Sequence, residues 1–295
     1  MRAYFRATVV QGRPGDLQVR SSLFRRALCL AAAVPCFALA AGPAQAGDTV
    51  HVLVIKEQGV GSAAQAQPYV DKLVAAAAKV NGWAAAVGKY ATTREAAETV
   101  IHGDDPHYGI MSLGAFLGLR GKHQLEVLGK AEVTTAGGRE YHIVSKTATD
   151  LAGCKGKPLA SNHAGDVRFL EKVVARGGFA LTDFTLVVTT RPVQTIKKVI
   201  SGEAECALID DAQYAELAKI EGGAALKSVW KSDKLPGMVV VAFPSAPAAE
   251  RSAFKNSLAR VCSGEGKAAC GEAGIKDLSA AGATDYQAVV TAYGK

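Results

Sequence analysis

The feature that most constrains the fold is a repeated alternation of short apolar runs with helical patterns. Val50–Ile55 is a continuous β-branched and apolar run, as in a buried strand, and Ala63–Val80 has an alanine-rich helical face. The alternation restarts with Lys157–Ser161 as a strand and Asp166–Arg176 as a helix. Such alternation predicts parallel sheets with right-handed crossovers. The sequence therefore predicts an α/β protein with two lobes.

The other elements continue this pattern. Two sets of strands and helices, with a strand that returns after residue 237, indicate an interrupted first lobe: residues 47–138 and 238–295 form lobe I, and 139–237 form lobe II. Thr92 or Thr93 caps a helix that runs to about His102. Further expected strands are Trp83–Tyr90, Tyr108–Leu113, Leu125–Thr134, Glu140–Lys146, Phe184–Thr189, Cys206–Asp210 and Met238–Phe243, and further expected helices are Ala115–Arg120, Val193–Ser201, Gln213–Ile220, Ala248–Val261 and Asp285–Tyr293.

The first 46 residues are typical of an export signal. Arg25 and Arg26 precede the apolar run Ala27–Ala41, and Ala44-Gln45-Ala46 offers the small residues of a cleavage site. The run is short for a membrane span, and a buried N-terminal helix is the alternative. Proline before Cys36 does not fit a lipoprotein signal. We expect a cleaved signal peptide over 1–46, a periplasmic location and no membrane anchor.

Removing this segment changes the charge. It holds six arginines and one aspartate, so the net charge falls from +7 for the whole chain to +2. The remaining chain has no basic excess that would attract nucleic acid. We therefore expect no nucleic-acid partner.

Four cysteines remain after residue 46, an even number in an oxidising compartment. Three pairings are possible, and we favour Cys262–Cys270, which closes a short loop, with Cys154–Cys206. A metal site is the alternative, but the spacings contain no C-x-x-C pair.

Candidate ligand residues lie where predicted strands end, because open parallel sheets bind ligands there. Ser161-Asn162-His163 stands between a strand and a helix, where free backbone N–H groups attract anions. The alternative is a plain helix cap with an idle histidine. Asp166 would compete with a bound anion unless it serves as the cap.

Two further strand ends in lobe II carry charge. Thr190 and Arg191 precede a helix, and Arg191 suits a bidentate pair with a carboxylate or a phosphate-type group. Asp210-Asp211 follows another strand and could accept from an ammonium group or hold Arg191. A surface arginine and a solvated acidic pair are the alternatives.

Lobe I offers polar residues at the ends of three strands. Tyr90 closes a strand and could form a pocket wall, although a core-edge tyrosine is the alternative. Gln58 and Ser62 lie in the loop after the first strand, and Ser112 follows the third. We include all four as candidate ligand residues.

Catalytic motifs are absent from the sequence. It contains no G-x-S-x-G, H-E-x-x-H or Walker A pattern. Gly59–Ala64 fits the loose G-x-G-x-x-A form of the dinucleotide-binding motif. However, no acidic residue stands at the end of the second predicted strand, where it would bind the ribose. We expect no catalytic residues, no cofactor and no metal.

Several segments, in order, resemble the substrate-binding proteins of phosphate, phosphite and phosphonate ABC importers. Leu151–Lys157 is similar to the family's "D-L-x-G-K" entry into the second lobe, and Ile200–Ala207 to its "V-x-x-G-x-x-D-x-A" turn. Val229-Trp230-Lys231-Ser232, followed by Leu235-Pro236-Gly237, resembles its return from that lobe. Gln67–Leu73 is similar to its first helix. The likeness spans about residues 50–290.

The resemblance implies a type II periplasmic binding protein, whose two lobes are joined by two crossing segments and close on a ligand. It implies a small anionic ligand, a membrane permease as partner, no catalysis and a monomer. Specificity transfers less well, since Asn162-His163-Ala164-Gly165 replaces the family's "S-T-S-G" helix start and only Tyr90 matches a pocket tyrosine directly. The functional alternative is a ligand sensor that acts on a membrane kinase or chemoreceptor.

Overall fold

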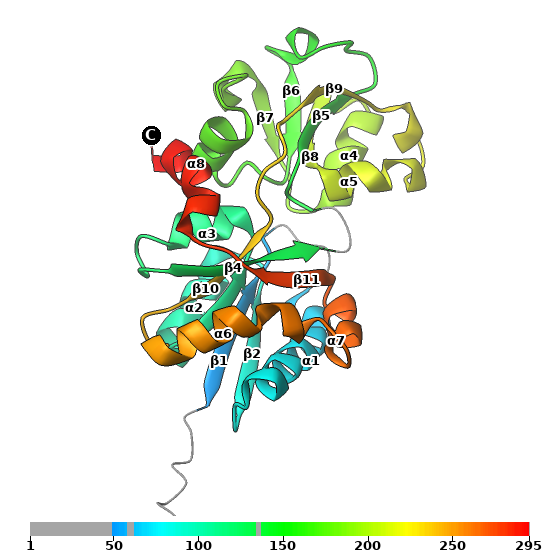
Figure 1. The fold of residues 1–295 in the computed structure, drawn as a ribbon. Coiled ribbons are helices and arrows are strands. Elements are labelled where there is room, and N and C mark those ends of the chain that lie inside the picture. The colour runs from blue at the N-terminus through cyan, green and yellow to red at the C-terminus, as the bar shows by residue number, and fades with distance from the viewer. Residues whose placement is uncertain (1–48, 58–61, 134–136, 295) are drawn as a thin grey trace, which may run out of the picture. The chain divides into compact units, whose positions relative to one another are not determined.

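Two β-sheets, each flanked by helices, organise the computed structural model (Figure 1). It describes residues 49–57, 62–133 and 137–294. Strands from both ends of this range build the six-stranded sheet, in the order β11-β4-β10-β3-β1-β2. Strands from the middle of the chain build the five-stranded sheet, in the order β7-β6-β8-β5-β9. The expected two-sheet α/β organisation is therefore present.

Both sheets are mixed rather than mostly parallel. In the six-stranded sheet β1 runs parallel to β2 and β3, whereas β10, β4 and β11 join by antiparallel pairing. In the five-stranded sheet β6 is parallel to β7 and β8, and β5 is antiparallel to β8 and β9. The strands are β1 (Val50–Ile55), β2 (Ala86–Ala91), β3 (Tyr108–Met111), β4 (Glu126–Val133), β5 (Tyr141–Ser145), β6 (Pro158–Ser161), β7 (Thr185–Val188), β8 (Cys206–Asp210), β9 (Lys227–Lys231), β10 (Met238–Ala242) and β11 (Ile275–Ala280).

Local sequence signals account for the helix ends. Ser62 caps α1 in a reciprocal capping box with Gln65, and Gly82 ends that helix with a left-handed φ of 67°. Thr93 caps α2 by accepting a hydrogen bond from the Ala96 N–H. The α-helices are α1 (Ala63–Asn81), α2 (Arg94–Asp104), α3 (Leu113–Leu119), α4 (Pro192–Ile200), α5 (Asp211–Glu216), α6 (Ala248–Val261), α7 (Gly266–Glu272) and α8 (Ala283–Gly294).

Burial on both faces explains the apolar strands. Along β1, Leu53 and Ile55 enter one hydrophobic cluster, whereas Val50, Val52 and Val54 enter another on the opposite face. The first cluster also contains residues of the five-stranded sheet, among them Leu159 in β6. It is therefore a core shared by elements of both sheets.

Both expected disulfides are present. Cys154 pairs with Cys206, and Cys262 pairs with Cys270. All four cysteines are buried or nearly so.

The helix expected over Asp166–Arg176 is not a regular α-helix throughout, because its residues Phe169–Val174 form a π-helix, here called η2.

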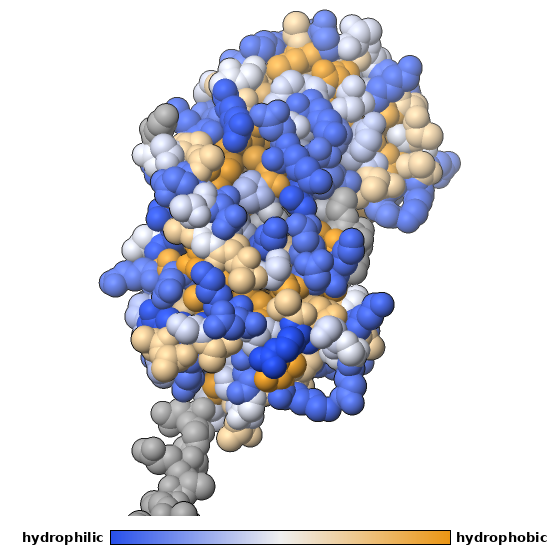
Figure 2. Space-filling view, viewed as in Figure 1, coloured by the Kyte–Doolittle hydropathy of each residue, from blue (hydrophilic) through white to orange (hydrophobic). Residues whose placement is uncertain are grey.

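No helix among the described residues has the length and apolar character needed to cross a membrane. Hydrophilic side chains are spread over the face seen in Figure 2, and apolar ones lie between them.

Candidate functional site

A hydrogen-bonded cluster follows β6, where the sequence places a ligand-binding turn. The Asn162 side-chain oxygen accepts from the Thr195 hydroxyl and from the Gln213 amide, both at 3.1 Å. The Thr195 hydroxyl also pairs with that of Thr189. All four side chains are buried. The cluster thus ties β6, the end of β7, α4 and α5 together at the carboxyl ends of the strands.

The other two residues of the turn have structural contacts. The Ser161 hydroxyl donates to the Leu208 carbonyl at 3.1 Å and accepts from the His163 N–H at 3.0 Å. The His163 ring packs edge-on to Tyr141, with 5.3 Å between ring centroids. Its Nε2 is buried, with no hydrogen-bond partner among the described residues. Burial lowers the pKa of His163, partly offset by Asp210, so the neutral imidazole is favoured.

Carboxylates concentrate around Tyr141. Burial raises the pKa of this phenol well above its usual value, and Asp210, Asp211, Glu57 and Asp166 raise it further. Glu57 follows β1 of the six-stranded sheet, whereas the other acids belong to the five-stranded part. Polar groups of both sheets therefore share one electrostatic environment.

The two acids at the end of β8 have different partners. Asp210 caps α5, since its Oδ1 accepts from the Gln213 N–H at 2.9 Å. The Asp211 Oδ1 accepts from the Arg139 N–H at 3.3 Å. Burial, followed by the charge of Asp210, raises the pKa of Asp211. Among the described residues, neither Asp210 nor Asp211 forms an ion pair with Arg191.

Arg94 is the cation of this region that the sequence analysis missed. Its Nε lies 2.9 Å from Glu57 Oε1, and its Nη2 lies 2.7 Å from Asp166 Oδ2. Burial acts to lower the pKa of Arg94, but the carboxylates of Glu57 and Asp166 outweigh it and raise the pKa. Arg94 is the first residue of α2. A cation is unfavourable at the positive end of a helix, so this position was itself a signal that an anion lies nearby.

The lobe I candidates are dispersed. Ser62 is exposed and caps α1. Tyr90 is half-buried near the end of β2, and burial raises its pKa. The Ser112 hydroxyl accepts from the Glu57 N–H at 3.4 Å, which places it beside the Arg94 group. Gln58 lies outside the described residues.

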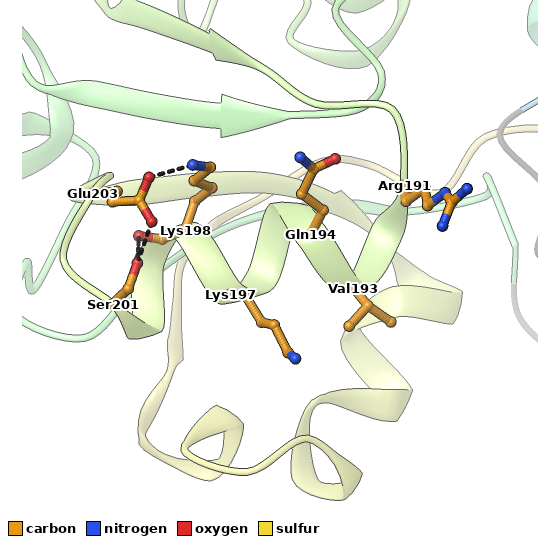
Figure 3. Close-up of a pocket in the computed structure, with 7 residues that line it drawn as sticks. All are labelled: Arg191, Val193, Gln194, Lys197, Lys198, Ser201 and Glu203. Atoms are coloured by element: carbon orange, nitrogen blue, oxygen red, sulfur yellow. Dashed lines mark hydrogen bonds and ion pairs between the residues drawn. The ribbon is translucent and has the colours of Figure 1, made fainter.

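Arg191 and Thr190 lie at the surface rather than in the Asn162 cluster. Arg191 is exposed at the start of α4 and lines a shallow pocket of about 560 Å³. In Figure 3 its side chain extends from the start of the helix, away from the ion pair of Lys198 with Glu203. Thr190 is exposed, and its N–H donates to the Gln194 side chain at 3.4 Å.

Metal ligands do not gather at this site. Within the described ranges there is no group of three or more His, Cys, Asp or Glu side chains placed to hold a metal ion.

Comparison with known proteins identifies the family. A protein-family model described as "ABC transporter, phosphonate, periplasmic substrate-binding protein" matches residues 86–286, which are 201 of the 295 residues. The chain belongs to this family. None of the curated protein sequences compared with it matches. As a member of the phosphonate-transporter binding-protein family, it is a periplasmic substrate-binding component of an ABC importer.

Solved structures share the type II periplasmic binding protein fold. A Xanthomonas citri protein solved with chloride has a TM-score of 0.64 and 13% identity, covering 83% of this chain and 96% of that one. PhnD1 from Prochlorococcus marinus, in complex with methylphosphonate, has a TM-score of 0.61 and 12% identity, with the same coverage. The Escherichia coli aliphatic sulphonate binding protein SsuA has a TM-score of 0.52 and 12% identity, covering 83% and 90%. At these identities the likeness concerns the fold.

Family membership also fixes the general partners. The binding protein of an ABC importer takes a small ligand and delivers it to a permease. The family model describes a periplasmic substrate-binding component of a transporter.

Proposed function

We propose that this binding protein holds a small anion, phosphonate-, phosphate- or carboxylate-like, between its two lobes. The match of the phosphonate-transporter family to residues 86–286 carries the proposal, since this range contains strands β2 to β11 and lacks only β1 among the strands of the two sheets in the described chain. The proposed ligand residues are Gln58, Ser62, Tyr90, Ser112, Ser161, Asn162, His163, Thr190, Arg191 and Asp210. We also propose lobe boundaries at 47–138 with 238–295 and at 139–237, because strands β5 to β9 form one sheet.

The charges of the site narrow the ligand. Glu57, Asp166, Asp210 and Asp211 all raise the pKa of Tyr141, and the Arg94 guanidinium, which is paired with Glu57 and Asp166, offsets only part of this negative charge, so a ligand with two negative charges meets net repulsion there. An anion that also carries an ammonium group would satisfy one of these carboxylates. We therefore expect an aminoalkylphosphonate or an amino acid to bind more tightly than methylphosphonate.

We also propose that residues 1–46 are a cleaved export signal. The mature protein is proposed to be a freely diffusing monomer without catalytic activity. The basis for the export signal is the order of its parts: Arg25-Arg26 comes first, an apolar run follows, and Ala44-Gln45-Ala46 ends the segment. The basis for a non-catalytic role is the lack of a nucleophile–base motif in the sequence.

A thermal-shift screen tests the ligand class. Phosphate, phosphite, methylphosphonate, 2-aminoethylphosphonate, sulfonates and small amino acids are each added to the purified protein. A ligand at one hundred times its Kd stabilises the folded state by about 2.7 kcal/mol and raises the Tm accordingly. No shift with any phosphorus oxyanion would exclude the phosphonate-type ligand, and a shift with amino acids alone would favour the carboxylate class.

Variants on one helix test the role of Arg191. Arg191→Ala should weaken binding of the ligand found in the screen, because a bidentate anion contact is lost. Lys197→Ala is the control, since Lys197 lines the same surface pocket on α4 without being a proposed ligand residue. Unchanged affinity in Arg191→Ala would remove this residue from the site.

A further inference from the structure

The guanidinium of Arg94 is held firmly on the side of the six-stranded sheet. Nη2 donates to Glu57 Oε2 at 3.0 Å and to the Gly114 carbonyl at 2.8 Å, while Nε lies 2.9 Å from Glu57 Oε1 and makes no hydrogen bond within the described part of the chain. Gly114 permits this approach, because a Cβ there would lie 3.3 Å from Nη2 and 3.2 Å from Glu57 Oε2. Arg94 therefore keeps its position through contacts to the end of β1 and to α3.

Asp166 is held equally firmly on the side of the five-stranded sheet. Its Oδ1 accepts from the Phe169 N–H at 2.9 Å and so caps the helical segment that contains η2. Its Oδ2 faces the other way, 2.7 Å from Arg94 Nη2. One carboxylate thus caps its own helix and meets a cation from the other lobe.

The last helix adds a second connection between the lobes. Helix α8 follows β11 of the six-stranded sheet, yet Tyr286 and Val289 enter the same core cluster as Phe169 and Leu170 of η2. Figure 1 shows α8, in red, beside this green segment. The Tyr293 hydroxyl donates to Asp166 Oδ2 at 3.1 Å. Asp166 is therefore contacted from α2 and from α8.

We propose that Asp166 is a built-in anion that latches the two lobes together when no solute is bound. A guanidinium, a phenol hydroxyl and a backbone N–H at a helix start converge on its carboxylate, which is the kind of donor set that binds an oxyanion. The side chains of Arg94, Glu57 and Asp166 are only 23%, 21% and 16% exposed, so water and salt screen the contact less than a surface ion pair.

The latch follows from rigidity on both sides. Because Asp166 is fixed by its cap and Arg94 by Glu57 and Gly114, hinge opening must break the contact between them rather than stretch it. The closed arrangement therefore gains stability without a ligand. The inference rests on the proposed binding function, since a latch matters where lobes open and close around a solute.

Small-angle X-ray scattering without added solute tests the latch. Asp166→Asn removes the charge while keeping a residue suited to capping, and Glu57→Gln/Arg94→Gln removes the cation without leaving Glu57 unpaired. Both should increase the radius of gyration relative to the wild type. Lys122→Gln is the control, because the Lys122 side chain is 60% exposed and its ion pair with Glu98, at 2.8 Å, lies within lobe I.

The pattern among variants separates a latch from general damage. Combining Asp166→Asn with Glu57→Gln/Arg94→Gln should open the protein no further than either change alone, since both break one contact. Circular dichroism identifies variants that do not fold. If the Asp166 or Arg94 variants do not fold, Tyr293→Phe is tested in their place. This change removes one donor from Asp166, so it should increase the radius of gyration by a smaller amount. Scattering from folded variants that superimposes on the wild type would overturn the latch, as would equal opening of the Lys122→Gln control. The solute screen is independent, so either proposal can fail alone.

Discussion

At the scale of single residues, the buried Tyr108 is unusual. Its ring packs against Trp83, at 5.4 Å between centroids, and against Phe254, at 4.4 Å. Its hydroxyl is buried and has no hydrogen-bond partner within the described part of the chain. An unmade hydrogen bond of this kind costs stability, whereas the ring contributes packing.

Tyr108→Phe should therefore raise the free energy of unfolding by about 1 kcal/mol at pH 8, measured by urea denaturation. Burial raises the pKa of Tyr108 to about 12. Tyr108 then ionises at a lower pH in the unfolded chain than in the folded protein. The free energy of unfolding therefore falls as the pH rises from about 10 to about 12, and Tyr108 does not change it below about pH 10. The variant should lose less stability over this interval.

Tyr69→Phe is the matched control for this prediction. The Tyr69 side chain is 45% exposed on α1, so removing its hydroxyl should change stability by less than about 0.5 kcal/mol. A loss of stability in Tyr108→Phe at pH 8 would mean that the hydroxyl has a partner in solution.

The sequence predicted the roles of some residues of the site but not of others. Asp166 was expected to be a cap if it did not compete with a ligand, and it caps the helix of η2. Thr195 and Gln213 were missed, because their bonds to Asn162 join the turn after β6 to helices α4 and α5, which lie 33 and 51 residues later at these positions. Such contacts depend on how the helices pack, which no local pattern records.

At the scale of elements, strongly patterned segments were predicted well. The predicted bounds of β1, β8 and α6 match the structure, since each has a clear apolar pattern. Strand β11 was missed because only Ile275 and Leu278 of its six residues are buried and Lys276 and Asp277 separate them. Its pairing with β4, rather than its own composition, makes it a strand.

The contact between β4 and β11 should be sensitive to added volume. A Cβ at Gly129 would lie 2.5 Å from the Ser279 carbonyl oxygen and 2.3 Å from Leu258 Cδ1. Gly129→Ala should therefore destabilise the protein by about 1–3 kcal/mol in urea denaturation. Gly103→Ala on α2, where no atom lies within 4 Å of the new Cβ, should stabilise it by up to about 1 kcal/mol. Equal effects of the two changes would contradict the close approach.

At the scale of the whole molecule, the alternation of strands and helices predicted two α/β lobes but not the direction of every strand. Apolar runs such as β10 look alike whether they pair parallel or antiparallel. Direction follows from where the chain re-enters a sheet, and β10 returns beside β3 after the five-stranded sheet is complete. The mixed pairing therefore could not be deduced from composition.

The two disulfides should differ in their effect on stability. Cys154 and Cys206 are 52 residues apart, whereas Cys262 and Cys270 are eight apart. In the chain-entropy account, the longer loop contributes about 4 kcal/mol and the shorter about 2.5 kcal/mol. Urea denaturation of Cys154→Ala/Cys206→Ala and of Cys262→Ala/Cys270→Ala should show this order, and the reverse order would indicate that native-state packing dominates.

The division of strands between the sheets also sets an order of assembly. All strands of the five-stranded sheet lie between residues 141 and 231, so that sheet can be completed while later residues are still crossing a membrane or leaving a ribosome. The six-stranded sheet must wait for β10 and β11. Tyr293 follows both strands in the chain, so its hydroxyl can join the last helix to the five-stranded lobe only once nearly all of the described chain is available for folding.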